Sequence, residues 1–115
     1  MIYRQGDVIL IRVSDDAAHD VVPSPKDPRG SVLAEGETSG HHHAVFGRGH
    51  KLFRFRDASG QQLLVTGKNG AEIRVVGGGA GGVPRHEPIQ VAPGKYVIRT
   101  QRSWTSANLS PRVED

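Results

Sequence analysis

Short runs in which apolar and polar residues alternate fill this chain, and no window of about a dozen residues keeps the 3.6-residue apolar period of an amphipathic helix. Glycines and prolines separate the runs, as turns separate strands. The pattern predicts an all-β protein of about eight short strands, folded as a small antiparallel β-barrel or sandwich. Strands are expected over residues 7–13, 31–37, 41–46, 51–57, 62–66, 71–77, 86–91 and 95–104.

Two of these stretches carry distinct side-chain patterns. Residues 7–13 are apolar on both faces, which is typical of a central strand. Residues 51–57 alternate strictly, which predicts one buried face and one basic face. The alternation sets Leu52, Arg54 and Arg56 against Phe53 and Phe55.

The connections between the strands differ in length and chemistry. Residues 14–30 carry three prolines and many charges, which predicts a long surface loop with one helical turn near 15–19. The Gly- and Asn-containing stretches 57–61 and 67–71 predict hairpin turns, so that 71–77 would continue a meander. Pro93-Gly94 fits a type II turn.

Length and composition set limits on the class of protein. The chain has 115 residues, which predicts one β domain over 1–105 followed by a polar tail over 106–115. It has no cysteine, so a metal site would have to use histidine and carboxylate ligands. No apolar run approaches the roughly 20 residues of a membrane helix, which predicts a cytoplasmic protein without membrane contact. Edge strands in so small a sheet would allow a homo-oligomer.

A glycine block contains the spacing of a dinucleotide-binding fingerprint at Gly77, Gly79 and Gly82. That fingerprint requires a helix N-terminus after it to hold the pyrophosphate. Here Val83-Pro84 leads into another extended segment. The pattern therefore favours a flexible loop or hairpin tip over a nucleotide site.

Three consecutive histidines form the most informative motif. On a strand, His41 and His43 point to one face about 7 Å apart, and His42 points to the other. Two such imidazoles can act as cis ligands to one divalent transition metal (Zn, Ni, Fe or Mn). A third ligand would come from His86 or Glu87.

Other residues extend or replace this ligand set. His50 and Glu37 are alternative ligands, and Glu37 or Glu87 could serve as a catalytic base or as an orienting carboxylate. The reaction and the small-molecule substrate are not defined by the motif. A plain alternative is that histidines beside a Gly turn are simply solvated.

A second enzymatic hypothesis uses no metal. Here His41, His43 and His86 would transfer protons on a phosphate ester, and Lys51 or Arg85 would hold its charge. No pattern in the sequence makes one ring the donor and another the acceptor. Metal binding is therefore the favoured hypothesis of the two.

A non-enzymatic binding module for nucleic acid or a partner protein is the remaining hypothesis. The net charge is +3. A basic sheet face with an aromatic residue next to it could bind single-stranded nucleic acid. Carboxylates at 57, 72 and 87 could neutralise part of this charge. The proposed surface consists of Arg54, Arg56, Arg102 and Trp104.

Most of the chain resembles a group of short bacterial and phage proteins with no established activity. The shared pattern is Q-G-D-V at 5–8, A-E-G-E-x-x-G-H-x-H at 34–43, H-x-P-I-x-x-P-G-x-Y-x-V at 86–97, and Q-R with an aromatic residue at 101–104. The resemblance implies a site around His41, His43 and His86. The H-x-H pair is also similar to cupins, which place a Glu a few residues later. Residues 44–53 contain no Glu, and His50 would replace that ligand.

Overall fold

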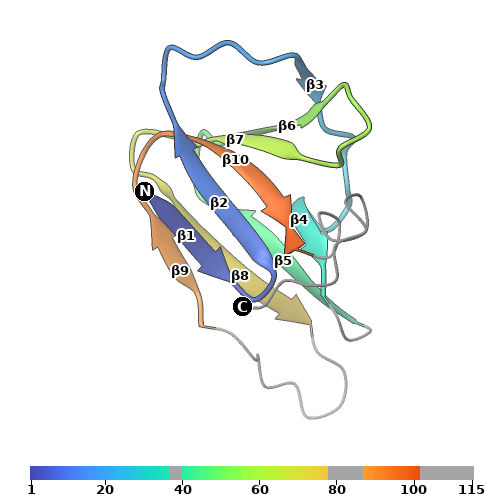
Figure 1. The fold of residues 1–115 in the computed structure, drawn as a ribbon. Coiled ribbons are helices and arrows are strands. Elements are labelled where there is room, and N and C mark those ends of the chain that lie inside the picture. The colour runs from blue at the N-terminus through green and yellow to red at the C-terminus, as the bar shows by residue number, and fades with distance from the viewer. Residues whose placement is uncertain (37–39, 78–86, 102–115) are drawn as a thin grey trace.

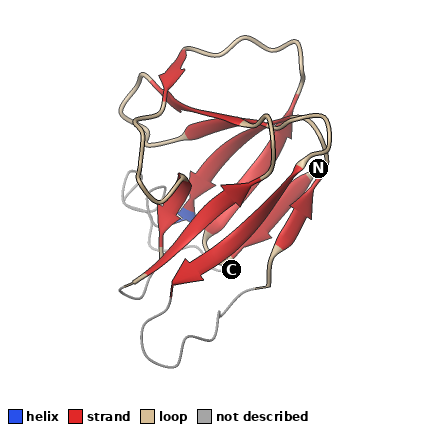
Figure 2. Cartoon of the chain, turned by 180° about the vertical axis from the view of Figure 1, so that it is seen from behind, coloured by secondary structure: helices blue, strands red, loops and turns tan. Residues whose placement is uncertain are grey.

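The computed structural model describes residues 1–36, 40–77 and 87–101. Strands dominate this part of the chain, and every strand pair is antiparallel (Figures 1 and 2). The strands are β1 (Ile2–Gln5), β2 (Val8–Val13), β3 (Val21–Pro23), β4 (Ser31–Glu35), β5 (His41–Phe46), β6 (Lys51–Phe55), β7 (Gln62–Val65), β8 (Ala71–Gly77), β9 (Ile89–Val91) and β10 (Lys95–Thr100).

These strands form two sheets that face each other. The first has six strands in the order β1-β2-β10-β7-β6-β3, and the second has four in the order β4-β5-β8-β9. In Figure 1, β1, β2 and β10 lie in front of β8 and β5. The predicted all-β class is confirmed, and the arrangement is that of a sandwich, since the sheets do not close into a barrel.

The core lies between the two sheets and takes its side chains from both. It contains fully buried Val8 and Leu10 of β2, whereas Ile9 and Ile11 on the other face are only half-buried. As predicted, β2 is an internal strand, paired with β1 and β10. The buried hydrophobic cluster consists of Val8, Leu10, Leu33, Val45, Leu64, Ala71, Ile73, Val91, Tyr96 and Ile98.

Two strands lie where none was expected. β1 turns back onto β2 through Gly6, whose φ of 60° suits a tight turn. β3 interrupts the loop predicted for 14–30 and pairs with β6. Near 15–19 the chain makes a turn, in which the Ala17 amide donates to the Ser14 carbonyl, rather than a helix.

The meander predicted for β7 and β8 is wrong. The hairpin of β6 and β7 forms as expected, but β8 pairs with β5 and β9, in the other sheet. The Gly67–Gly70 turn and the Pro93–Gly94 turn both carry the chain from one sheet to the other. Two hydrogen bonds join these turns. The Thr66 amide donates to the Gly94 carbonyl at 3.0 Å, and the Gly94 amide donates to the Thr66 hydroxyl at 2.8 Å. The φ of Gly94 is 157°, far from the roughly +80° of the predicted type II turn.

Some expectations lie outside the described residues. These are most of the glycine block, the polar tail at 106–115, and the last residues of the strand predicted to reach 104. Among the residues that are described, no helix has the length and apolar character to cross a membrane.

Candidate functional site

His43 lies in the interior of the sandwich, bound to a side chain from the opposite sheet. It is 3% exposed and sits in the middle of β5, between Ala34 of β4 and Val75 of β8. Its Nδ1 lies 2.9 Å from Oε1 of Gln5, the last residue of β1. A buried polar contact therefore joins the two sheets at this point.

The hydrogen bonds of Gln5 determine which nitrogen of His43 carries the proton. The Gln5 Nε2 donates to the carbonyl of Ile73 at 3.0 Å and to the carbonyl of Glu87 at 2.8 Å. Because both partners can only accept, the amide nitrogen must face them and Oε1 must face His43. His43 therefore donates through Nδ1, and in the neutral ring Nε2 is the basic nitrogen.

His41 shares a strand face with His43, as predicted from alternation, and is half-buried at the start of β5. It lies opposite Gly77 of β8. Gly77 has a φ of 87°, and a Cβ there would lie 2.0 Å from the Gly40 carbonyl oxygen. The close approach of the two backbones next to His41 therefore depends on this glycine.

His42 points to the opposite side of β5 from His43 and is also buried, at 7% exposed, near a charged cluster. Arg29 pairs with Asp27 at 2.9 Å and with Glu35 at 2.7 Å. The side-chain hydrogen bond from Arg29 is the largest cause that lowers the pKa of Asp27 to about 2 and lowers the pKa of Glu35. His42 adds a smaller effect in the same direction on both carboxylates.

Of the other residues predicted for the metal site, the structure describes Glu87 but not His86 or Glu37. The Glu87 residue is exposed, while its backbone carbonyl accepts the hydrogen bond from Gln5. Within residues 1–36, 40–77 and 87–101, no three His, Asp or Glu side chains cluster closely enough to hold a metal ion.

His50, the alternative ligand, has both ring nitrogens in hydrogen bonds. Its Nδ1 lies 2.7 Å from the Gly47 carbonyl oxygen and its Nε2 lies 2.7 Å from the Ser31 Oγ. Since a carbonyl only accepts, Nδ1 carries the proton and Nε2 of the neutral ring accepts from the Ser31 hydroxyl. These bonds link the β5–β6 connection to the start of β4.

Only two of the four residues predicted for the basic surface, Arg54 and Arg56, lie in the part of the chain that the structure describes. Arg56 forms an exposed ion pair with Asp20 at 2.9 Å, and Arg102 and Trp104 lie outside the described residues. The prediction for β6 is confirmed only in part, because Arg54 and Arg56 are exposed as expected but Leu52, on the same face, packs against the core. Leu52 and Arg54 also line a pocket. The two phenylalanines at 53 and 55 are half-buried. Alternation alone separated the two faces of β6 but did not show that Leu52 reaches the core.

Gln5 was not among the predicted site residues, although it opens the Q-G-D-V part of the recurring pattern. Its contact with His43 spans 38 residues of sequence. The one local signal is a polar residue just before a Gly turn, and it does not identify the partner.

Ten described strands in two facing antiparallel sheets, with a buried Gln–His pair between them, define a small β-sandwich protein with a polar interior site. The chain belongs to the family described as a domain of unknown function (DUF8820), whose model matches residues 4–101. No curated protein and no solved structure matches the chain.

Proposed function

We propose that the protein binds a divalent transition metal through His41 and His43, with His86 as the third ligand. The observation that carries this proposal is the hydrogen bond from His43 Nδ1 to the Gln5 carboxamide. Metal-binding histidines commonly donate their other ring N–H to a carbonyl or carboxylate, which fixes the ring and makes the ligating nitrogen more basic. Gln5 provides this arrangement for His43 and directs Nε2 as the ligand.

The position of Glu87 supports the choice of His86. Glu87 is the next residue in the sequence, and its carbonyl oxygen lies 2.8 Å from Gln5 Nε2. One carboxamide thus contacts both His43 and the chain beside residue 86. Zn, Ni, Fe or Mn would suit a set of imidazole ligands, and three protein ligands would leave a coordination position for water or a substrate. Glu37 or Glu87 would then assist as a base, in a hydrolytic or cupin-like reaction.

The test is metal content and metal-dependent stability. The purified protein, first stripped with a chelator and then titrated with Zn²⁺ or Ni²⁺, is expected to bind about one equivalent and to melt at a higher temperature when loaded. The His41→Ala variant is expected to lose this stabilisation, because it removes one ligand without opening the Gln5 contact. The matched control is His50→Gln, which lies on the β5–β6 connection and is expected to bind metal as the wild type does.

Two results would reject the proposal. One is a wild-type protein whose melting temperature does not respond to either metal. The other is an equal response in the wild type and in His41→Ala.

The alternative proposal, a binding module for nucleic acid or a partner protein, has weaker support. Of the residues expected on its surface, Arg56 is already paired with Asp20 and Arg54 lines a pocket that also contains Asp57. Its signature would be affinity for DNA or RNA that falls steeply with salt and is lost in the Arg54→Ala/Arg56→Ala double variant.

A further inference from the structure

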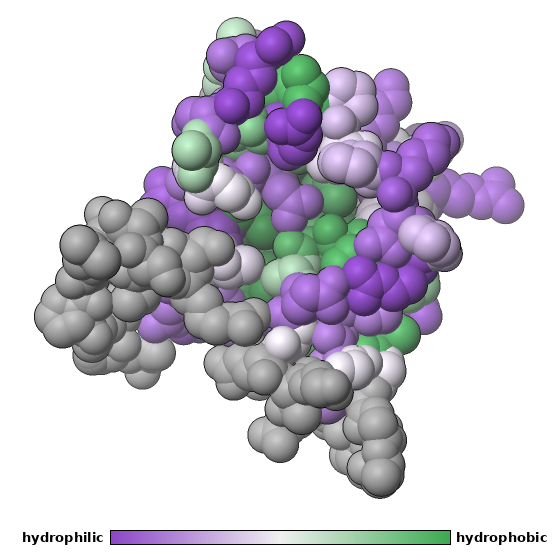
Figure 3. Space-filling view, turned by 90° about the vertical axis from the view of Figure 1, so that its right-hand side faces the viewer, coloured by the Kyte–Doolittle hydropathy of each residue, from purple (hydrophilic) through white to green (hydrophobic). Residues whose placement is uncertain are grey.

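A pocket of 730 Å³ opens between the two sheets, next to the start of β4. One wall is the end of the six-stranded sheet at β6 and the β6–β7 turn, and the other is the β3–β4 connection with the start of β4. Figure 3 shows a hollow on this side of the molecule, with hydrophobic atoms on its floor and hydrophilic residues around it. None of the histidines at 41–43 lines this pocket. It is therefore separate from the proposed metal site.

The pocket is lined by both polar and apolar residues, and a hydrogen bond between the sheets lies beside it. Val32, Leu52 and Phe55 supply apolar surface. Gln62 of β7 donates from Nε2 to the Leu33 carbonyl of β4 at 2.7 Å, which joins the two sheets beneath the opening. The volume of 730 Å³ lies within the range of about 300–1,000 Å³ that is typical of small-molecule sites.

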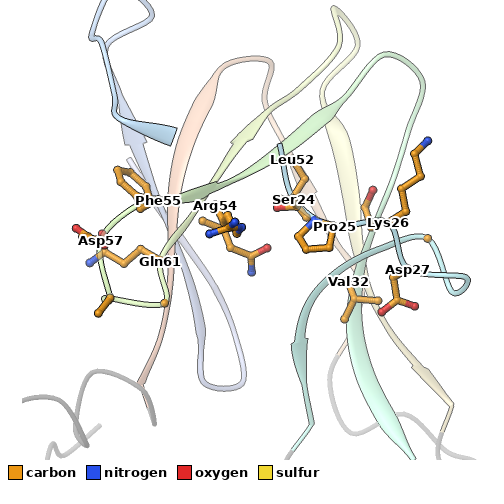
Figure 4. A pocket seen from close by; sticks show the side chains of 15 residues that line it. Ser24, Pro25, Lys26, Asp27, Val32, Leu52, Arg54, Phe55, Asp57 and Gln61 are labelled. Atoms are coloured by element: carbon orange, nitrogen blue, oxygen red, sulfur yellow. The ribbon is translucent and has the colours of Figure 1, made fainter. Parts of the chain in front are cut away.

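Arg54 is the charged group in the middle of this pocket. In Figure 4 its side chain lies between Ser24 and Pro25 on one side and Phe55 and Gln61 on the other. It forms no ion pair with a carboxylate of the described residues, whereas Arg29 and Arg56 each do. A guanidinium with apolar surface beside it is suited to a bidentate bond with a carboxylate.

The acidic residues at the pocket limit the charge of the ligand. Asp27 is paired with Arg29 at 2.9 Å, so its charge is largely compensated. Asp57 accepts from the Ser59 amide at 3.0 Å and keeps a negative charge on the lining. Lys26 also lines the pocket, so with Asp27 compensated the two cations Arg54 and Lys26 exceed Asp57 by one positive charge. A ligand with one negative charge fits this balance.

We infer that this pocket binds a small organic monoanion, with its carboxylate on Arg54 and an apolar or aromatic body against Leu52, Phe55 and Val32. The inference does not depend on the metal site, because His41, His43 and Glu87, the described residues proposed for that site, do not line the pocket.

The experiment uses 1-naphthoate as the probe and 1-naphthamide as its neutral counterpart, titrated into ¹⁵N-labelled protein. Naphthoate is expected to shift the amide resonances of Leu52, Arg54 and Phe55 in a saturable way, and naphthamide is expected to bind about tenfold more weakly. The Arg54→Gln variant is expected to lose the preference for the anion. Arg56→Gln, just after the end of β6, is the matched control and is expected to keep this preference.

Three outcomes would overturn the inference. The first is the absence of saturable shifts at these amides, and the second is an unchanged preference for naphthoate in Arg54→Gln. The third is tighter binding of a short oligonucleotide at the same resonances. Since Arg54 is exposed, Arg54→Gln is expected to fold, which the dispersion of its own spectrum checks.

Discussion

Gln5 shows how one buried polar residue can organise an interior site. A carboxamide has two N–H donors and one carbonyl oxygen, and all three functions of Gln5 are used, on Ile73, Glu87 and His43. A fully satisfied buried group costs little, but it becomes costly when its partners are removed. The residue therefore both stabilises the packing of the sheets and fixes the ring of His43.

Replacing Gln5 by Met keeps the size of the side chain but removes its hydrogen bonds. His43 Nδ1 and the Ile73 and Glu87 carbonyls would lose their partner, so we expect the free energy of unfolding to fall by about 2–4 kcal/mol. Urea denaturation followed by circular dichroism measures this change. The control is Gln90→Met at an exposed position of β9, where a change below about 0.5 kcal/mol is expected. Equal effects at the two positions would contradict the importance of the buried network.

Arg29 provides a second residue-scale test, through the pH dependence of stability. The pKa of Asp27 is about 2 in the folded protein against an ordinary 3.8, and that of Glu35 is also lowered. A depressed carboxyl pKa stabilises the folded state above the ordinary value, and this stabilisation is lost as the pH falls towards the folded value. We therefore expect Arg29→Met to be less stable than the wild type at pH 7, and the difference to disappear between pH 4.5 and about pH 2. Urea midpoints measured across this range test it, and a difference independent of pH would refute the assignment.

The sequence predicted which residue types make the site but not what surrounds them. Strand alternation correctly separates His42 from His41 and His43, since it depends only on backbone geometry. The contact of His43 with Gln5 and the pairing of Ser31 with His50 could not be predicted. Each joins residues far apart in the chain, and tertiary packing alone brings them together.

At the scale of elements, strand positions follow from the local pattern more closely than strand partners do. The expected strands at 41–46 and 71–77 match β5 and β8 residue for residue. β3 was missed because three residues ending in Pro23 carry too little periodic signal. The Gly67–Gly70 turn has hairpin chemistry, yet the strand after it joins the other sheet, because burial of Ile73 and Ala71 between the sheets decides its partner.

Gly77 and Gly30 form a matched pair for testing a strand-end contact. Both have positive φ, of 87° and 103°, so alanine is strained at either position. At Gly77 a Cβ would also meet the Gly40 carbonyl oxygen, whereas nothing lies within 4 Å at Gly30. We expect Gly77→Ala to destabilise the protein by about 2 kcal/mol more than Gly30→Ala, because the start of β5 must move. Urea denaturation of the two variants measures the difference, and equal losses would show that the contact with Gly40 is unimportant.

At the scale of the whole molecule, specific polar contacts join the sheets at several places around the apolar core. Gln5 and Gln62 reach from the six-stranded sheet to carbonyls of β8 and β4. Elsewhere, the Ala92 amide donates to the Tyr3 hydroxyl at 3.0 Å, and the Tyr96 hydroxyl donates to the Ala92 carbonyl at 2.6 Å. The two tyrosine rings meet edge to face, with centroids 5.8 Å apart. Hydrophobic burial favours contact between the sheets, and these directional bonds set how they align.

Tyr96 makes this alignment sensitive to alkaline pH. Burial is the main cause that raises its pKa, and Tyr3 adds to the effect. The unfolded chain loses the phenolic proton near pH 10, whereas the folded protein retains it to higher pH, so stability falls as the pH rises past about 10. Tyr96→Phe cannot ionise, but it loses the bond to Ala92, which costs about 1 kcal/mol at neutral pH. We therefore expect the wild type to be more stable than Tyr96→Phe at pH 8 and to lose that advantage as the pH rises past about 10, by urea denaturation. Groups that do not contact Tyr96 affect both proteins alike, so a constant difference between the two proteins would mean that Tyr96 ionises as readily in the folded sandwich as in the unfolded chain.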